Sequence, residues 1–474
     1  MKNFSKDRKS VADLKIAYIG GGSRSWAYTL MNDLAQEPAL SGTVALYDID
    51  FDAAYNNEII GNKLSAREDV VGKWKYKAYK AISEALIDAD FVAISILPGT
   101  FEEMVSDVHA PEKYGIYQSV GDTTGPGGIV RTLRTVPMFE EFANAIKEYC
   151  PNAWVINFTN PMAACVKTLY KTFPEIKAFG CCHEVFGTQK VMREMIREKY
   201  GFTPDREEIK INVVGINHFT WLTSAKYKEI DVFKLYADYV KEHPNGIDNN
   251  DDNWVGISTS NKQKVKFDLF RRYGYIAAAG DRHLVEFCNG CWYLKDPATV
   301  EKYGFKLTSV ESRKEILKKR LKKAERLATG EEEFNLHDSG EESVRQIKAL
   351  LGLGDFVTNV NIPNIGQIPN SPMDAIVETN AFFCADTVQP VLAGPVPNNV
   401  NAMVMRILEE QETVVEAAIR GDYELAFTAF SNNANINLPI DKARALFDEM
   451  LENTKDYLPY YEKYKKERSE CGEQ

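Results

Sequence analysis

The stretch that decides the fold is Ile16-Ala17-Tyr18-Ile19-Gly20-Gly21-Gly22-Ser23, in which four apolar residues run directly into three glycines. The apolar run predicts a buried strand, and residues 26–35 follow it with the spacing of an amphipathic helix. A glycine-rich turn between a strand and a helix is the setting of a dinucleotide-binding loop. Gly20 allows the tight turn, and Gly22 lets the backbone approach a pyrophosphate at the helix N-terminus.

The residues around this loop also fit a nucleotide site. Ser25 stands where the motif usually has its third glycine or an alanine, which is a mild departure. Asp48 ends the strand expected at 44–47, where a carboxylate binds a ribose 2′-hydroxyl and favours NAD over NADP. The residues expected to bind the cofactor NAD⁺ are Gly20, Gly22, Ser23 and Asp48.

Short apolar runs alternate with helical stretches from residue 14 to about residue 200. Strands are expected at 15–19, 44–47, 91–97, 154–158, 176–180 and 209–214. This alternation predicts an α/β fold with a Rossmann-type, doubly wound parallel sheet that binds ligands at the carboxyl ends of its strands. Two domains are expected: an NAD-binding Rossmann-like domain at 14–200, and a mixed α/β catalytic and oligomerisation domain at 201–474. In the second, the charged helix at 311–330 is expected to be solvated.

The composition is that of a globular chain with an acidic surface. Of 474 residues, 44% are hydrophobic and 26% charged, and 57 basic against 68 acidic residues give a net charge of −11. An acidic chain argues against nucleic acid as a partner. No apolar run approaches the ~18 residues that indicate a membrane span, and residues 1–10 lack the apolar core of a secretion signal. The eight cysteines are too sparse for a disulfide framework, so we expect a cytoplasmic protein.

Metal-binding side chains follow two of the expected strands. Cys182 and His183 come directly after 176–180, and His218 comes after 209–214. One thiolate and one imidazole are too few for a structural zinc site, which takes four protein ligands. They suit an open site where substrate hydroxyls complete the shell of Mn²⁺ or a similar ion. The alternative is that Cys182 is a small buried hydrophobe, which describes its neighbour Cys181 better.

Polar side chains also mark two segments nearer the N-terminus. The glycine-rich loop 118–128 carries Asp122, and its three glycines around a proline fit a close approach of the backbone to a ligand. Asn157 and Asn160 flank the end of another strand, where they could hydrogen-bond sugar hydroxyls or a nicotinamide ribose. An ordinary flexible connection and a capped turn are the respective alternatives.

A third polar cluster, at 279–287, holds Asp281, Arg282, His283 and Glu286 within six positions. A solvated loop is one interpretation. The apolar residues before it favour a lined cleft instead, in which Arg282 can bind a carboxylate in bidentate fashion.

Taken together, these motifs resemble glycoside hydrolase family 4 over essentially the whole chain. The resemblance lies in Gly20–Ser23, Asp122-Thr123-Thr124-Gly125-Pro126-Gly127-Gly128, Asn157-Phe158-Thr159-Asn160-Pro161, Cys182-His183-Glu184-Val185 and Gly215-Ile216-Asn217-His218. The Cys-His-Glu-Val form is similar to the uronide-cleaving branch of the family. The stretches 96–99, 117–128 and 181–187 look most like bacterial α-galacturonidases. An α-glucuronidase, which carries a similar Cys-His-Glu-Val, is the alternative within the family.

The resemblance implies a mechanism that differs from the usual pair of carboxylates. NAD⁺ would remove a hydride from C3 of the sugar, and the resulting ketone would acidify the proton on C2. A base would take that proton while Mn²⁺ stabilised the enediolate. Loss of the glycosidic oxygen, addition of water and return of the hydride would complete a hydrolysis without net redox change.

By position, the resemblance places Cys182 and His218 on the metal and His183 at the proton donor. It gives Asp122 the task of tuning the catalytic base. The base itself is Asp281 in our interpretation, although other branches of the family use a tyrosine.

The resemblance also implies contacts to a small uronide substrate. Asn160 would touch it, and Arg282 and Glu184 would read its carboxylate end, Glu184 through a partner because like charges repel. A homodimer or homotetramer is implied as well. The alternatives from other classes are an NAD-dependent malate-type dehydrogenase, which would accumulate NADH, and a sugar-nucleotide sensor without turnover.

Overall fold

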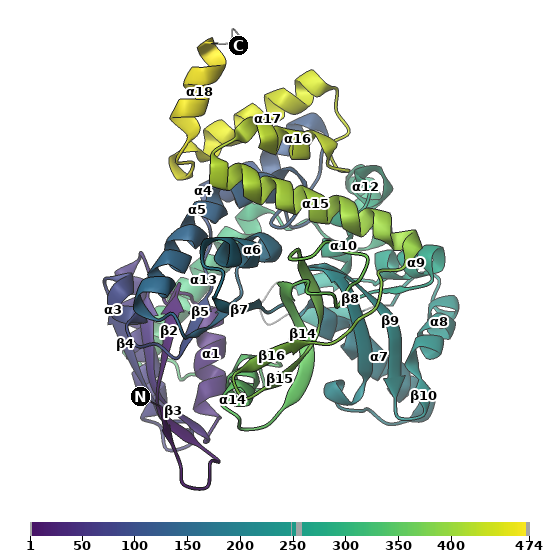
Figure 1. The fold of residues 1–474 in the computed structure, drawn as a ribbon. Coiled ribbons are helices and arrows are strands. Elements are labelled where there is room, and N and C mark those ends of the chain that lie inside the picture. The colour runs from purple at the N-terminus through teal and green to yellow at the C-terminus, as the bar shows by residue number, and fades with distance from the viewer. Residues whose placement is uncertain (1, 248, 253–257, 471–474) are drawn as a thin grey trace.

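One sheet runs through most of the molecule (Figure 1). The computed structural model describes residues 2–247, 249–252 and 258–470. In this sheet the strand order is β16-β15-β14-β7-β6-β5-β2-β3-β4, and the short strand β1 (Asn3–Phe4) pairs with β2. Layers of helices cover it, and the C-terminal helices gather at one end of the molecule.

The first six long strands are parallel. They are β2 (Val11–Ile19), β3 (Leu40–Tyr47), β4 (Trp74–Tyr79), β5 (Phe91–Ile94), β6 (Trp154–Asn157) and β7 (Lys177–Gly180). Numbered along the chain, they lie in the order 3-2-1-4-5-6 of a doubly wound dinucleotide-binding fold, which confirms the predicted fold class. Strand β4 was not predicted, although Trp74-Lys75-Tyr76-Lys77 alternates in polarity as a half-buried strand does, unlike the continuous apolar runs of the predicted strands.

Helices connect these strands. They are α1 (Trp26–Ala35), α2 (Phe51–Ser65), α3 (Ile82–Leu86), α4 (Phe101–His109), α5 (Gly125–Tyr149), α6 (Met162–Thr172) and α7 (Glu184–Tyr200), with the 3₁₀ turns η1 (Ala110–Tyr114) and η2 (Arg206–Glu208). The helix expected at 26–35 forms over those residues.

The same sheet continues beyond residue 200. Strands β14 (Phe356–Pro363), β15 (Ile376–Cys384) and β16 (Thr387–Pro390) add to it in antiparallel fashion, with Asn361 of β14 paired to Gly180 of β7. Strand β7 would otherwise present an unpaired edge. The C-terminal half of the chain therefore completes the sheet of the N-terminal half.

A second, smaller sheet contains β8 (Lys210–Ile216), β9 (Phe219–Tyr227), β10 (Ile230–Asp231) and β13 (Ile276–Ala277). Strand β11 (Asn249–Asp252) pairs with β12 (Ser258–Asn261). The helices of this half are α8 (Val232–Glu242), α9 (Lys264–Tyr273), α10 (Asp281–Phe287), α11 (Gly290–Tyr293), α12 (Pro297–Tyr303), α13 (Val310–Thr329), α14 (Ser343–Leu350), α15 (Asn398–Arg420), α16 (Tyr423–Asn432), α17 (Ile440–Thr454) and α18 (Tyr461–Glu470), with the 3₁₀ turn η3 (Lys455–Tyr457). Helix α15 packs on α5 and α6 of the first half.

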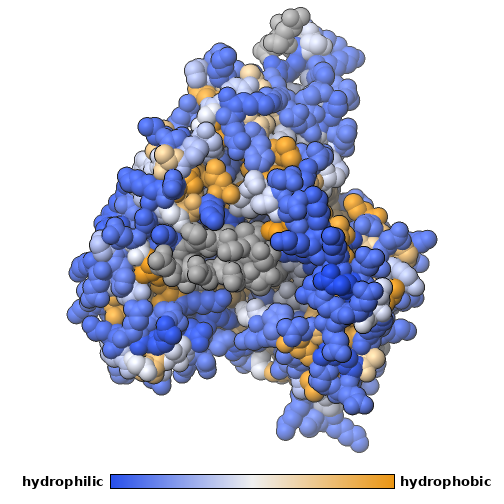
Figure 2. Space-filling view, turned by 180° about the vertical axis from the view of Figure 1, so that it is seen from behind, coloured by the Kyte–Doolittle hydropathy of each residue, from blue (hydrophilic) through white to orange (hydrophobic). Residues whose placement is uncertain are grey.

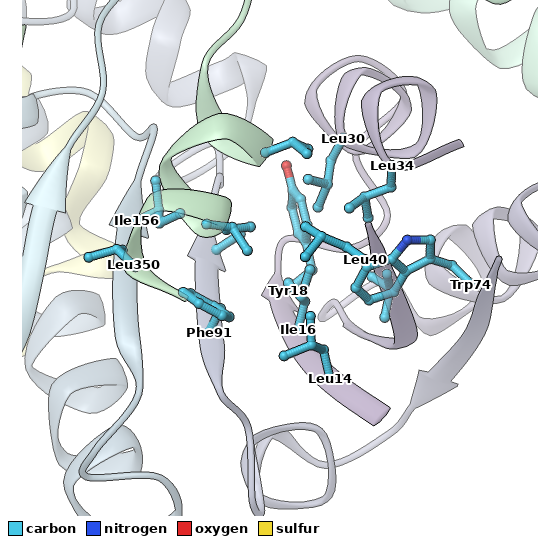
Figure 3. Packing of buried hydrophobic residues seen from close by; sticks show 14 of the residues in the cluster. Leu14, Ile16, Tyr18, Leu30, Leu34, Leu40, Trp74, Phe91, Ile156 and Leu350 are labelled. Atoms are coloured by element: carbon cyan, nitrogen blue, oxygen red, sulfur yellow. The ribbon is translucent and has the colours of Figure 1, made fainter. Parts of the chain in front are cut away.

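The largest core also joins the two halves. Figure 3 shows Leu350 of α14 beside Phe91 of β5 and Ile156 of β6, in a cluster that continues through Tyr18 to Trp74. The surface in Figure 2 is largely hydrophilic, with its apolar residues in small separate groups. Within the described ranges, no helix combines the length and apolar character needed to cross a bilayer.

Candidate active site

The candidate active site lies at the carboxyl edge of the parallel strands, next to the small sheet. Asn160 follows β6, and Cys182 and His183 follow β7. His218 occupies the turn between β8 and β9 with a φ of 61°. A histidine in the left-handed region is uncommon, and such residues cluster at functional sites.

Three side chains from distant segments form a compact group of metal-binding type. The possible ligand atoms of Asp122, His218 and His283 all lie within 4.8 Å of one another, and the two imidazole rings are 3.8 Å apart between centroids. Two imidazoles and a carboxylate are ligands that divalent transition metals accept. Of these three residues, the sequence predicted only His218 as a ligand.

Hydrogen bonds decide which imidazole nitrogen of each histidine keeps a lone pair that a metal ion could use. The Thr123 hydroxyl donates to Asp122 Oδ1 at 2.7 Å, so it accepts from His218 Nδ1 at 3.1 Å. His283 Nε2 lies 3.5 Å from Glu184 Oε1, while its Nδ1 has no partner. Each ring therefore keeps one nitrogen with a free lone pair. Glu184 lies behind His283 as carboxylates commonly do behind histidines that bind metals.

Burial also affects the protonation of the two imidazole rings. Together with the neighbouring His283, burial lowers the pKa of His218 to about 3. It also lowers the pKa of His283, against the pull of Glu184 and Asp122. Both rings are therefore neutral near pH 7, as metal ligation requires.

Cys182 lies outside the group of three. Burial, with Glu378 and Glu184 adding to it, raises the pKa of its thiol far above the ordinary range. Its backbone carbonyl accepts a hydrogen bond from Asn359 Nδ2 at 3.3 Å. Its role as a metal ligand stays a prediction.

Glu184 is placed differently from our expectation of a uronate-reading residue. Its Oε2 accepts the backbone N–H of Gly280 at 2.7 Å, and its Oε1 faces His283. It therefore orients a residue of the metal-binding group and holds the start of α10. Contact with substrate stays a prediction for Glu184.

Within the described part of the chain, several buried polar atoms at this site have no hydrogen-bond partner: Asn160 Oδ1, Arg282 Nε, His283 Nδ1, Glu286 Oε2 and Arg313 Nε. Buried polar groups are almost always paired, so a cluster of unpaired ones indicates a place for a ligand. The cluster contains two guanidinium groups, which match the geometry and charge of a carboxylate.

Of this cluster, Arg313 was not predicted, and Glu286 was noted in the polar cluster at 279–287 but given no role. Glu286 Oε1 accepts the backbone N–H groups of Val120 and Gly121 at 2.8 and 2.9 Å, and burial raises its pKa to about 7. Arg313 donates to the Val120 carbonyl at 2.9 Å. Both hold the loop that carries Asp122. A role for Arg313 at the site was not predicted, because Arg313 lies in the helix that was expected to be solvated.

Arg282 and Asn160 lie near Asp122, and their contact with substrate stays a prediction. Arg282 donates to the Thr308 hydroxyl. Asn160 Nδ2 lies 3.5 Å from Asp122 Oδ2, and its carbonyl accepts from Arg131 Nε at 3.1 Å.

Asp281 points away from this group. Its two oxygens accept the backbone N–H groups of Val265 and Lys266 at 3.2 and 3.0 Å, at the start of α9. Its side chain is fully buried, and burial raises its pKa to about 6. These contacts favour a capping role, and the assignment of Asp281 as base stays a prediction.

His183 faces the nucleotide side of the site. Its Nδ1 lies 3.4 Å from Glu341 Oε1, and its ring centroid is 6.0 Å from that of Trp26 in α1. The side chain is 32% exposed, which leaves it accessible to a ligand.

The glycine loop has the close packing that a dinucleotide site requires. A Cβ on Gly20 would lie 2.0 Å from the Ser95 carbonyl oxygen. The Gly22 N–H donates to Asp48 Oδ2 at 2.9 Å, and the Ser23 hydroxyl accepts from the backbone of Trp26 at 3.1 Å, in the first turn of α1. Each Asp48 oxygen keeps a further lone pair with which to accept a ribose hydroxyl.

Comparison with known proteins matches both halves of the chain. The model of family 4 glycosyl hydrolases matches residues 15–198, and that of the family's C-terminal domain matches residues 213–436. An α-galacturonidase from Thermoanaerobacterium saccharolyticum is 61% identical over 94% of this chain and 97% of its own length. An α-galacturonidase from Bacillus subtilis is 49% identical over 93% of this chain and 97% of its own length.

Solved structures share the fold. The crystal structure of LplD from Bacillus subtilis superposes with a TM-score of 0.88 at 49% identity, covering 93% of this chain and 100% of that one. A 6-phospho-α-glucosidase from gut microorganisms, solved in complex with NAD and Mn²⁺, has a TM-score of 0.76 at 21% identity and covers 94% and 99% of the two chains. Both family models match this chain, and relatives are 49% and 61% identical to it, which excludes the malate-type dehydrogenase alternative. The chain belongs to family 4 of the glycosyl hydrolases.

Proposed function

We propose that this protein hydrolyses α-galacturonides, glycosides of a sugar acid. The observation that carries the proposal is the pair of guanidinium groups, Arg282 and Arg313, whose buried Nε atoms lack partners beside the metal-binding group. Glu286 and Asp122 already lie near both guanidinium groups, and a substrate carboxylate would give their unpaired Nε atoms a charged acceptor that a neutral sugar does not supply. The names of the relatives at 49% and 61% identity support the same substrate class.

NAD⁺ and Mn²⁺ are the proposed cofactors. A family 4 structure solved with both supports this, as do the glycine loop and the unpaired His283 Nδ1 of this chain. When bound, NAD⁺ takes up and returns a hydride and the metal stabilises negative charge on sugar oxygens. Asp122, His218 and His283 would hold the metal, with Cys182 as a further ligand.

The other residues hold and orient the substrate in this proposal. Arg282 and Arg313 bind its carboxylate, Asn160 accepts from a sugar hydroxyl through its free Oδ1, and His183 donates a proton at the cofactor side. Glu184 supports His283 from behind.

The base is tested by Asp281→Asn, because the two possible roles of Asp281 predict opposite results. A catalytic base would lose about 10²–10⁴-fold in kcat while the folded state kept its stability. A cap of α9 would lose stability while the remaining folded enzyme kept its kcat. Thermal unfolding and kcat measured on the same preparation separate the two, and the contacts of Asp281 favour the second result.

Substrate preference provides the main test. With NAD⁺, Mn²⁺ and a thiol reductant present, p-nitrophenyl α-galacturonide should be cleaved faster than the α-glucuronide, and the α-galactoside, which has no carboxylate, should be poor. Equal rates for galacturonide and galactoside would contradict the proposal. A faster glucuronide would shift it to the other uronidase, and net NADH formation would indicate a dehydrogenase.

Assembly and location complete the proposal. We infer a homodimer or homotetramer in the cytoplasm, as the family resemblance and the sparse cysteines suggest. Light scattering on the purified protein tests the assembly, and a monomeric mass would refute it.

A further inference from the structure

A basic groove lies beside the glycine loop, between α1 and α13. The cavity has a volume of about 320 Å³ and is lined by four cationic side chains, Arg24, Lys319, Arg320 and Lys323. No carboxylate is among its lining residues, although the chain as a whole carries a net charge of −11. Carboxylates also approach these cations from outside the lining: among the described residues, Asp50 lies 3.8 Å from Arg24 and Glu332 lies 3.9 Å from Lys323.

The cations of α13 share one face of that helix. Ile316, Lys319, Arg320, Lys323 and Leu327 line the groove at intervals of three or four residues, or next to one another. Burial lowers the pKa of Arg320, so placing this cation on the wall of the groove has a desolvation cost. The solvated helix face predicted for 311–330 does not explain why this cost is accepted. An anionic ligand in the groove would offset it, because a nearby negative charge stabilises the cation.

Helix α13 starts at the carboxyl edge of the sheet and runs beside α2 toward the opposite edge. Near its start, Lys314 pairs with Glu102 of α4 at 2.7 Å. Near its end, the Ala328 carbonyl accepts from Lys63 of α2 at 2.6 Å. Helices α2 and α4 follow strands β3 and β5, which flank β2 in the sheet. Because the glycine loop leaves the carboxyl end of β2, the first half of α13 lies near it, and the groove is lined from both sides.

We propose that α13 forms the second wall of the dinucleotide site, where Lys319, Arg320 and Lys323, with Arg24, bind the diphosphate of NAD⁺ on the side opposite the glycine loop. Arg24 and Ser25 join the two walls, because they follow the glycines directly and also line the groove. The backbone N–H groups at the start of α1 serve one side of the diphosphate, and the α13 cations serve the other. This inference rests on the proposed use of NAD⁺.

The test is the affinity of the full chain for NAD⁺, measured by isothermal titration calorimetry. The variant is Lys319→Gln with Lys323→Gln, and the matched control is Lys318→Gln with Lys322→Gln on the same helix, outside the groove lining. We expect the Kd of the groove variant to rise about 10-fold, from two lost charge contacts, and that of the control to change less than about 2-fold. The Kd of wild type should also rise with salt more steeply than that of the groove variant.

Three ligands identify the group that is bound. Adenosine diphosphate ribose should lose the same factor as NAD⁺, because it keeps the diphosphate, and adenosine should lose none. Equal losses for adenosine would overturn the inference, as would inorganic pyrophosphate that bound the groove without competing with NAD⁺. A wild-type protein that failed to bind NAD⁺ would refute the proposed function, whereas a groove variant that bound it as well as wild type would refute only this inference. Circular dichroism and the single variant Lys319→Gln guard against a folding defect.

Discussion

A buried ion pair behind the active site gives a quantitative prediction. Arg134 of α5 and Asp107 of α4 are both fully buried, with Arg134 Nη1 at 2.9 Å from Asp107 Oδ1 and a second contact from Nη2 to Oδ2. Arg134 Nε also donates to the Pro98 carbonyl at 3.0 Å. The Asp107 carbonyl accepts from Gln118, whose Oε1 accepts the Gly127 N–H at 2.9 Å, so the pair supports both ends of the loop that carries Asp122.

Replacing Asp107 by Asn keeps the shape of the side chain and removes its charge. At 2.9 Å and an effective dielectric constant of 20, the lost attraction is about 6 kcal/mol. The amide retains part of it as a dipole, and stranding one partner of a buried pair typically costs about 3–5 kcal/mol. We therefore expect Asp107→Asn to lower the free energy of unfolding by about 3–5 kcal/mol.

The matched control is Glu102→Gln, which removes another ion-paired carboxylate from the same helix. Glu102 lies 2.7 Å from Lys314, but its side chain is 77% exposed, so we expect a loss of about 1 kcal/mol or less. Urea unfolding should be followed by tryptophan fluorescence and circular dichroism, and the two transitions should coincide before a free energy is extracted. Equal losses for the two variants would refute the reasoning. The double variant Asp107→Leu with Arg134→Met should be less destabilised than Asp107→Asn, because it leaves no unpaired charge.

Three further predictions concern the metal, a buried carboxyl group and the glycine loop. Cys182→Ser should weaken Mn²⁺ binding measured by calorimetry by about 10-fold or more, since a hydroxyl is a poorer ligand than a thiolate, and unchanged affinity would remove Cys182 from the metal site. Burial raises the pKa of Glu410 to about 7, so its contribution to stability is complete below its unfolded pKa of about 4.5 and is lost as the pH rises through 7. Glu410→Gln should therefore gain about 3 kcal/mol relative to wild type between pH 4.5 and pH 8 in urea unfolding, and a pH-independent difference would contradict the buried-carboxyl assignment. Gly20→Ala places a methyl group 2.0 Å from a carbonyl oxygen at a φ of 89°, and calorimetry should show no NAD⁺ binding by the variant, whereas binding as tight as that of wild type would show that the loop can rearrange.

Local patterns predicted the nucleotide half of the fold well. The run before Gly20 and the helix at 26–35 are set by periodicity within a few residues, and the alternation of strands and helices predicted a doubly wound parallel sheet but neither β4 nor the strand order. The addition of β14 to β7 could not be predicted in this way, because it joins residues 180 and 361 across most of the chain.

The site shows the same division. His218 was found because it follows a strand, but its partners Asp122 and His283 come from separate segments that only the folded chain brings together. For the cluster at 281–286, the sequence could not predict which side chains point toward the site. On α10, Glu286 lies one helical turn beyond Arg282 and His283 and faces the site with them, whereas Asp281 turns to the start of α9.

The pairing of β14 with β7 has a consequence for biosynthesis. During translation, the parallel sheet emerges with β7 as an unpaired edge and with a core that lacks Leu350. The edge is paired and the core is completed only after nearly 180 further residues have been made. Bare strand edges invite pairing with other chains, and contacts so distant in sequence form slowly. The ribosome-bound N-terminal half is thus the species most prone to aggregate, and a fragment that ends near residue 200 should need the remainder of the chain, supplied in trans, to stay in solution.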